Sequence, residues 1–387
     1  PDPILRDPDP DTDPDPVLDP DPDPIVDPDP EPTPSPTPAP DPTPVGDGVA
    51  GCDADEQVFR FLVPPEHDPR HHSAAAIATQ INRQFNHLYC MQLVEREDFT
   101  DTTEWDRFRG TANDIDFTAI DHTALVRIWQ YAGHPKYQLF DLPFLFTSGA
   151  ALDEFLDSTT ARTNLAASLE VDRAVLLGYW RQPMLQFSAT GPIVEPNNLA
   201  GRKIALHRFA PTFYQRYLHT SGAALVRLDD AELSTALQTG VVDGLDIRID
   251  RFEDLATAHL LDGLTMTHHR ATVQLVIIQQ STWQRLPTNH REEIGRIIHK
   301  VSAEHRAQSA QQEREARARL VARGVPVRTL SDAQRLQWQQ AARLVWQEAT
   351  ADVPADYIDA ALHAGNADES LLLIGKAPPA ARQLNTP

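Results

Sequence analysis

The segment at residues 232–246 limits the fold of this 387-residue chain more than any other. Its first half has the spacing of a helix that an aspartate at position 229 or 230 can cap, with the apolar residues on one face. Gly240 stands where a helix end favours a left-handed residue, and Val241 and Val242 then predict a short buried strand. A helix that leads through a glycine into a short strand is an α/β unit, so we expect an α/β protein.

Further segments alternate between short apolar runs and helical spacing. Strands are predicted at residues 58–63, 91–95, 175–180, 203–207, 225–228 and 273–278, and a helix at residues 73–89. Short strands that alternate with helices favour sheets whose strands are mainly parallel. About 335 residues take part in this pattern, which is enough for two domains.

Two helices are predicted after the last strand. The first covers residues 289–322, where Asn289 and Glu292 can form a capping box and Gly324 can end the helix. Ser331 and Gln334 form a similar pair at the start of a final amphipathic helix. The apolar residues of that helix are Leu336, Ala341, Leu344 and Val345.

The first fifty residues have a different composition from the rest. They hold eighteen prolines and fourteen acidic residues against one arginine, a net charge of −13, so −9 of the formal −22 remains for residues 51–387. Proline at every second position excludes helices and sheet ladders, and the like charges repel one another. We expect a disordered, extended tail at residues 1–50, either a spacer of up to ~150 Å at ~3.1 Å per residue or a dispensable solubilising segment.

The acidic surplus argues against nucleic acid and anionic membrane surfaces as partners. No run of eighteen apolar residues is present, so no membrane-spanning segment is predicted. The chain begins at Pro1 and not at methionine, and we interpret it as a mature product from which a signal peptide has been removed.

The two cysteines precede neighbouring predicted strands. Cys52 lies before the strand at 58–63 and Cys90 opens the strand at 91–95. If these strands are parallel neighbours, both thiols lie at one edge of a sheet, and an oxidising compartment would join them. The sequence leaves a disulfide and two free thiols equally open.

Five motifs occur in the order and spacing of a known receptor family. They are Asp141–Phe146 (DLPFLF), Gly191–Ile193 with Asn198–Ile204, the segment at 232–246, Thr265–His269 and Trp283–Pro287. Over residues 58–350 the chain resembles the solute-binding receptors of tripartite ATP-independent periplasmic (TRAP) transporters, of the dicarboxylate-receptor type. His268 and His269 fall in the fourth motif, near the expected hinge, where the resemblance implies a structural role.

The resemblance implies a two-lobe α/β fold of the periplasmic-binding-protein type, similar to type II, with a long C-terminal spine helix. Lobe I is expected at 53–182 with 271–310, and lobe II at 183–270 with 311–387. The implied function is the capture of a small, organic-acid-like solute in the cleft between the lobes and its delivery to TRAP-type membrane subunits. The implied location is periplasmic or extracytoplasmic, with a lipid anchor upstream of the tail as a further expectation.

Two other functions stay open at this stage. A sensory or surface-interaction protein could keep the fold and lose transport, and a metal-dependent enzyme is a more distant alternative. No phosphate-binding loop, nucleophile elbow or catalytic cysteine–histidine pair is present, so we expect no enzyme and no cofactor. The polar cluster Glu66–His72 follows a strand at its carboxyl end. It could bind a metal, but we favour a polar cleft loop or the start of a helix.

The resemblance also implies positions for ligand contacts, and the chain departs from the family at them. Ala205 and Leu185 stand where the family has carboxylate-binding arginines, and Ile247 stands near a family asparagine. A guanidinium is hard to replace where a carboxylate loses its water. The residues that we expect to line the cleft are Arg208 as first choice, then Arg181, Arg248, Trp180, Tyr214, His67, Asp246, Ala205 and His207.

Overall fold

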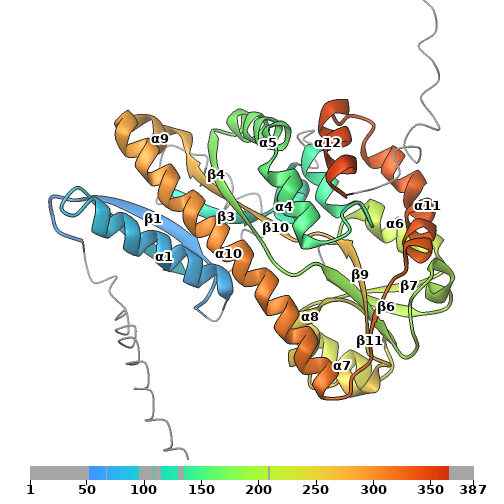
Figure 1. Cartoon of the computed structure of the whole chain (residues 1–387). Helices are drawn as coiled ribbons and strands as arrows, with labels where there is room; N and C mark the ends of the chain where they lie inside the picture. The colour runs from blue at the N-terminus through green and yellow to red at the C-terminus, as the bar shows by residue number, and fades with distance from the viewer. Residues whose placement is uncertain are drawn as a thin grey trace, which may run out of the picture. The chain divides into compact units, whose positions relative to one another are not determined.

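The computed structural model describes residues 52–66, 68–95, 108, 115–129, 135–207 and 210–365. These residues build two β-sheets with helices packed around them (Figure 1). The predicted tail at residues 1–50 lies outside the described residues. None of the helices in the described ranges combines the length and the apolar character that a bilayer crossing needs.

The first sheet, sheet A, has the strand order β2-β1-β3-β10-β4. Strands β1 (Gln57–Val63), β2 (Tyr89–Glu95) and β3 (Phe117–Asp121) are parallel. Strand β10 (Val273–Gln279) runs antiparallel to β3 and to β4 (Ala174–Arg181). All seven residues of β10 are buried, as its almost wholly apolar sequence predicts for a central strand.

The second sheet, sheet B, has the order β11-β9-β5-β8-β6-β7. Its strands are β5 (Leu185–Ala189), β6 (Lys203–His207), β7 (Ala224–Leu228), β8 (Gly244–Arg248), β9 (Leu264–Arg270) and β11 (Val327–Thr329). Parallel pairing of β6 with β7 and β8 follows from the strand–helix–strand connections between them. Strand β5 is antiparallel to both β8 and β9.

Helices cover both sheets. The α-helices are α1 (Pro69–Gln84), α3 (His122–Trp129), α4 (Gly149–Asp157), α5 (Thr159–Val171), α6 (Thr212–Thr220), α7 (Leu233–Gln238), α8 (Ile249–Asp254), α9 (Gln280–Arg285), α10 (Thr288–Ala322), α11 (Asp332–Ala349) and α12 (Ala355–Gly365). In the described residues four short 3₁₀ helices join them: η1 (Pro135–Asp141), η2 (Pro196–Leu199), η3 (Asp230–Glu232) and η4 (Ala258–Leu260).

Helix α10 is the long spine helix that the resemblance implies. It packs against α1 and β4 beside sheet A, and against α8 and β11 beside sheet B. Figure 1 shows it as one continuous orange helix that passes both sheets. It begins at Thr288 after Pro287 without a side-chain cap, so the predicted capping box of Asn289 and Glu292 is wrong. The expected end is confirmed, because Gly324 follows with a φ of 77°.

The last two helices differ from the prediction. Ser331 and Gln334 do form the predicted capping box of α11. Of the four residues predicted for its apolar face, Val345 is buried, but Leu344 is 71% exposed and Leu336 is 38% exposed. The helix buries Trp338, Ala342 and Trp346 beside Val345. Helix α12 was not predicted, and it packs on α4 and α5, although the predicted lobes assign residues 311–387 to lobe II.

The segment 232–246 folds into the predicted unit with a later strand. Asp229 and Glu232 form a capping box, α7 buries Ala236 and Leu237, and Gly240 has a φ of 70°. Strand β8 begins at Gly244, whereas Val241 is 49% exposed, so the strand does not begin at Val241 as predicted. At Gly244 a Cβ would lie 2.5 Å from the Cδ1 atom of Ile204, so a larger residue would require the Ile204 side chain to move.

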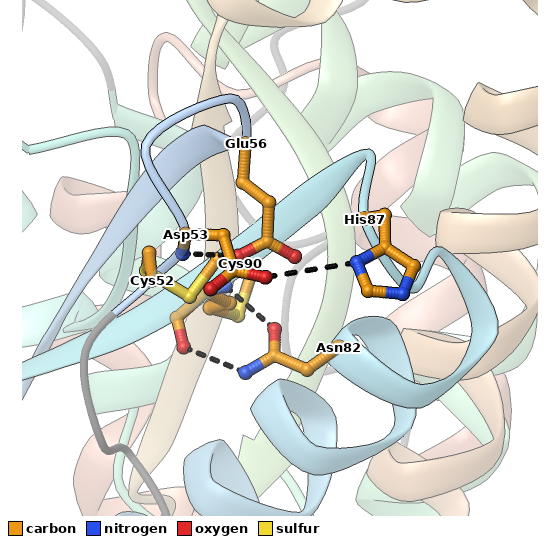
Figure 2. Close-up of a disulfide and its surroundings, with 7 residues drawn as sticks. Cys52, Asp53, Glu56, Asn82, His87 and Cys90 are labelled. Carbon is orange, nitrogen blue, oxygen red and sulfur yellow. Dashed lines mark hydrogen bonds and ion pairs between the residues drawn. A yellow bond between two sulfur atoms is a disulfide. The ribbon is translucent and has the colours of Figure 1, made fainter.

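Cys52 and Cys90 form a disulfide (Figure 2). Strands β1 and β2 are parallel neighbours, and Val58 lies opposite Cys90, which places both sulfurs at one edge of sheet A. The side-chain amide of Asn82 in α1 holds the backbone of Met91 beside the bridge, because its Nδ2 donates to the Met91 carbonyl and its Oδ1 accepts from the Met91 N–H. At the surface nearby, the Glu56 carboxylate accepts from the Asp53 amide, and Nδ1 of His87 lies 3.6 Å from the Asp53 carboxylate.

Candidate functional site

The chain changes sheets at three places in the described residues: two short crossings, and the passage from β10 to β11 through α10. It leaves sheet A after Arg181 and enters sheet B at Leu185, and it returns between Arg270 in β9 and Val273 in β10. The first of these crossings borders a small cavity, here called the crossing cavity. Its walls are Pro69 of α1, the crossing residues 181–183, the start of α8, and α10, which contributes His305, Gln308, Ser309 and Gln312.

The crossing cavity is narrow in this structure, with room for about one water molecule. Its lining is polar and charged, with few apolar side chains. Six of the ten lining residues lie at the carboxyl ends of β4 and β8 or shortly after the carboxyl ends of β1, β4 and β8, which is where open α/β sheets bind ligands. The cavity is therefore the best candidate for the ligand site in the described residues, in a conformation where side chains fill most of the space.

The β1–α1 connection contributes the first ion pair beside the cavity. Asp68 caps α1 by accepting from the amide of Arg70 at 2.8 Å. The Arg70 guanidinium donates back to both carboxylate oxygens, from Nε at 2.9 Å and from Nη2 at 2.8 Å. Burial raises the pKa of Asp68, but the hydrogen bonds and charge of Arg70 outweigh burial, so the pKa lies below its ordinary value of 3.8.

The β8–α8 junction contributes a second pair of the same kind. The Arg248 guanidinium donates to Asp250 from Nε at 3.0 Å and from Nη2 at 2.8 Å. Its Nη1 donates to the side-chain oxygen of Gln182 in the first crossing, so it links the two sheets. Burial opposes ionisation of Asp250, yet the charge of Arg248 holds the pKa of Asp250 below its ordinary value.

Arg181 lies deeper in the same wall. Its Nε donates to both oxygens of Asp153 in α4, at 3.0 and 2.9 Å, and Nη1 lies 3.5 Å from the Oγ of Ser309. The guanidinium packs over Gly149 at the start of α4, where a Cβ would lie 2.6 Å from the Cζ of Arg181. Gly149 therefore makes room for this arginine. Burial raises the pKa of Asp153 more than Arg181 lowers it.

His305 forms the floor of the cavity on α10. Its Nδ1 is 2.7 Å from the Oγ of Ser73, and its ring stacks on Trp180 at 5.1 Å. Burial lowers the pKa of His305 to about 4, so the ring is neutral at pH 7. His305 therefore adds no charge to the cavity.

The second crossing holds a fully buried ionic network. Arg270 donates from Nη1 to Asp141 at 3.0 Å and from Nη2 to Asp246 at 3.4 Å. Asp141 ends η1, beside sheet A, and Asp246 belongs to β8 of sheet B, so one guanidinium joins the two halves. The Cζ atom also lies 4.9 Å from the ring centre of Tyr214. Burial opposes the charge of Arg270, but the two carboxylates raise its pKa overall.

Two histidines complete this network. Nε2 of His122 lies 3.2 Å from the Asp141 carboxylate, and burial is outweighed by this acid, so the pKa of His122 is raised. The pKa of His269 shifts the other way. Burial lowers it, although Nε2 of His269 lies 3.0 Å from the Asp246 carboxylate. The ring of His269 stacks on Phe187 at 3.9 Å. The expected structural role of His269 fits this position.

The departures from the family pattern occupy two kinds of place. Ala205 and Ile247 are buried in an apolar cluster of sheet B, away from the crossing cavity. Leu185 lies at the first crossing, opposite Arg248 on one neighbouring strand and Arg270 on the other. The position that lacks the family arginine is thus flanked by two arginines of this chain.

The other expected ligand contacts fall in four environments. Arg181 and Arg248 lie at the crossing cavity. Trp180 is fully buried behind it, and Tyr214 and Asp246 belong to the buried network, while His207 is exposed at the end of β6. Arg208 and His67 lie outside the described residues, so their roles remain predictions.

The aspartates at and beside the cavity and Arg270 of the network are not among the predicted ligand contacts. Asp68 and Arg70 lay inside the polar cluster that was weighed as a metal site, and the sequence Asp-Pro-Arg at the end of a strand was the signal for a capped helix. Asp250, two residues after Arg248, offered a similar signal. Arg270 gave none, because its partner Asp141 is 129 residues away.

Comparison with known proteins identifies the family. The model for bacterial extracellular solute-binding proteins of family 7 matches residues 62–352. The C4-dicarboxylate-binding periplasmic protein DctP of Vibrio cholerae is 29% identical over 325 residues, which cover 82% of this chain and 94% of that protein.

Solved structures agree on the fold. A TRAP periplasmic solute-binding protein from Shewanella oneidensis with bound succinate has a TM-score of 0.66 at 23% identity, over 80% of this chain and 99% of that one. A related protein from Ochrobactrum anthropi, whose own C-terminus is bound in its ligand pocket, has a TM-score of 0.70 at 22% identity, over 80% and 95% of the two chains. The two-lobe receptor fold that the sequence predicted is thereby confirmed, and the chain belongs to the family 7 bacterial extracellular solute-binding proteins.

Proposed function

We propose that this receptor binds a small carboxylate-bearing solute at the crossing cavity and hands it to the membrane subunits of a TRAP-type transporter. Family 7 proteins are periplasmic solute receptors and not enzymes, and small solutes and TRAP membrane subunits are their partners. The Vibrio cholerae relative is named for binding C4-dicarboxylates. That name supports an organic acid as the ligand class.

One observation carries the choice of site. Arg181 and Arg248 approach one cavity from the two sides of the first crossing. A guanidinium in a site that excludes water binds a carboxylate strongly, because it offers paired donors and a charge that cannot titrate away. A rotation at the two crossings would open the cavity to solvent and close it again over a bound solute.

The proposal predicts a loss of affinity in the variant Arg248→Met. Removing one charge-assisted hydrogen bond costs ~1.5–3 kcal/mol, so the dissociation constant should rise by about 10- to 100-fold. Titration calorimetry with the solute that copurifies with the native protein would measure the change. Arg216→Met is the matched control, because Arg216 pairs with Glu348 at the surface, away from the cavity lining. Equal affinity in all three proteins would refute the assignment of Arg248.

We further propose that residues 1–50 act as a spacer between this receptor and a lipid anchor upstream. The proline-rich, acidic composition supports an extended chain without a stable core. A protein that lacks residues 1–50 should therefore bind its solute with the same affinity as the full chain. A dissociation constant that rises tenfold in the shortened protein would show that the tail takes part in binding.

A further inference from the structure

The charges beside the crossing cavity come in matched pairs. Arg70 pairs with Asp68, Arg181 with Asp153, and Arg248 with Asp250. Three guanidinium groups thus stand beside three carboxylates. Arg306, which follows His305 in α10, also has acidic partners, since its guanidinium lies 3.6 Å from Asp153 and 3.4 Å from Asp157.

Two of these pairs have the same local design and belong to different sheets. In each, an arginine and an aspartate two residues apart form a fork with two or more hydrogen bonds, at the start of α1 and at the start of α8. The two forks interact across the crossing. The charge of Arg248 favours the ionised form of Asp68, and the charge of Arg70 opposes that of Arg248. A solute in the cavity therefore meets both signs of charge, from Arg181 and Arg248 and from Asp250.

This arrangement is unfavourable for a dianion. Taking charged groups out of water is costly, and only well-placed opposite charges offset that cost. A second carboxylate on the solute would face Asp250, which lines the cavity together with the two arginines. A solute with one carboxylate and one cationic group avoids this repulsion, because it can insert into a fork and offer each half a new partner of opposite sign.

Asp250 is the best placed of the three acids to receive a cation. It lines the cavity itself, and its side chain keeps 31% exposure, whereas the side chain of Asp68 keeps 9%. Gln182, Gln308 and Gln312 add neutral hydrogen-bonding groups to the same wall, which suit either end of a polar solute.

We infer that the solute of this receptor is a zwitterion, whose carboxylate is bound by Arg181 and Arg248 and whose cationic group is bound by Asp250. This inference rests on the proposed function and narrows its ligand class. It sets this receptor apart from the dicarboxylate specificity that its Vibrio cholerae relative is named for.

A matched series of probes tests the inference on the full chain. Succinate, 4-aminobutanoate and 1,4-diaminobutane have the same length and carry two negative, one of each, or two positive charges at pH 7. We expect 4-aminobutanoate to bind at least tenfold more tightly than the other two in titration calorimetry. Asp250→Asn should lower the affinity for 4-aminobutanoate at least tenfold and leave that for succinate unchanged or higher. Asp262→Asn, at an exposed arginine pair away from the cavity lining, should change neither affinity.

A second measurement covers the case in which these probes have the wrong shape. The solute released by denaturing native protein can be assigned a charge from its electrophoretic mobility at pH 7 and at pH 2. A released zwitterion does not migrate at pH 7 and migrates as a cation at pH 2. An anion at pH 7, or succinate as the tightest probe, would overturn the inference and leave the proposed function standing. If no solute is released and no probe binds, the proposed function fails and this inference fails with it.

Discussion

Replacing Arg270 with methionine is expected to lower the free energy of unfolding by about 3–5 kcal/mol. Arg270 is 5% exposed and is the partner of two carboxylates, Asp141 and Asp246, that have no solvent exposure at all. Without the guanidinium, two ionised acids would stay buried at the crossing between the sheets. The penalty comes from these unpaired charges more than from lost packing, because methionine fills a similar volume.

Urea denaturation at pH 7 measures this effect on the purified protein. Arg216→Met serves as the control, since exposed ion pairs contribute little to stability. A change of less than 1 kcal/mol for Arg270→Met would mean that the network does not hold the two sheets together.

The same variant should respond to acid in a distinctive way. Burial opposes the ionised form of Asp246 in the native protein, but Arg270 and His269 keep its pKa below 3.8. The stability that Asp246 contributes is therefore present above pH 3.8 and is lost as the pH falls through the lower, folded-state pKa. In Arg270→Met the pKa of Asp246 should rise instead, so protonation relieves the penalty. The stability gap between native protein and variant should shrink from pH 7 to pH 4, whereas a packing defect would leave it constant.

Removing the disulfide is expected to lower the free energy of unfolding by about 2–4 kcal/mol. The bridge joins Cys52 to Cys90 across 38 residues, which restricts the unfolded chain, and it fixes the start of β1 to β2. The double variant Cys52→Ala/Cys90→Ala, compared with the oxidised native protein in urea, measures the loss. Reductant should destabilise the native protein by a similar amount and leave the double variant unaffected.

Solute binding should survive loss of the disulfide. Cys90 lies at the amino end of the parallel strands β1 and β2, whereas Asp68 and Pro69 of the site follow the carboxyl end of β1. An unchanged dissociation constant in the double variant would separate stability from binding. A tenfold loss of affinity would instead tie this edge of sheet A to the site.

Local signals predicted much of the fold. Gly240, Gly324 and the Ser331–Gln334 capping box each mark a helix boundary through backbone chemistry that acts within a few residues. The predictions failed where long-range packing decides the outcome. The face of α11 that looked apolar includes the exposed Leu344, because Trp338 and Trp346 donate hydrogen bonds to carbonyls of Val194 and Pro143 and turn the helix toward them.

The site was harder to predict than the fold for the same reason. Arg181 and Arg248 were expected at the cleft because each ends a strand, and strand ends gather at one side of a sheet. The partner of Arg181 could not be read from the sequence, since Asp153 lies 28 positions away. Arg270 was missed altogether, because its two acids come from distant elements that only the folded crossing brings together.

Native mass spectrometry of the receptor isolated from its own cell envelope tests the central claim most directly. We expect one small molecule per chain in the native protein and in Arg216→Met, and its loss from Arg248→Met. A bare chain in all three proteins, or a molecule that Arg248→Met retains as fully as the native protein, would contradict a solute held at the crossing cavity.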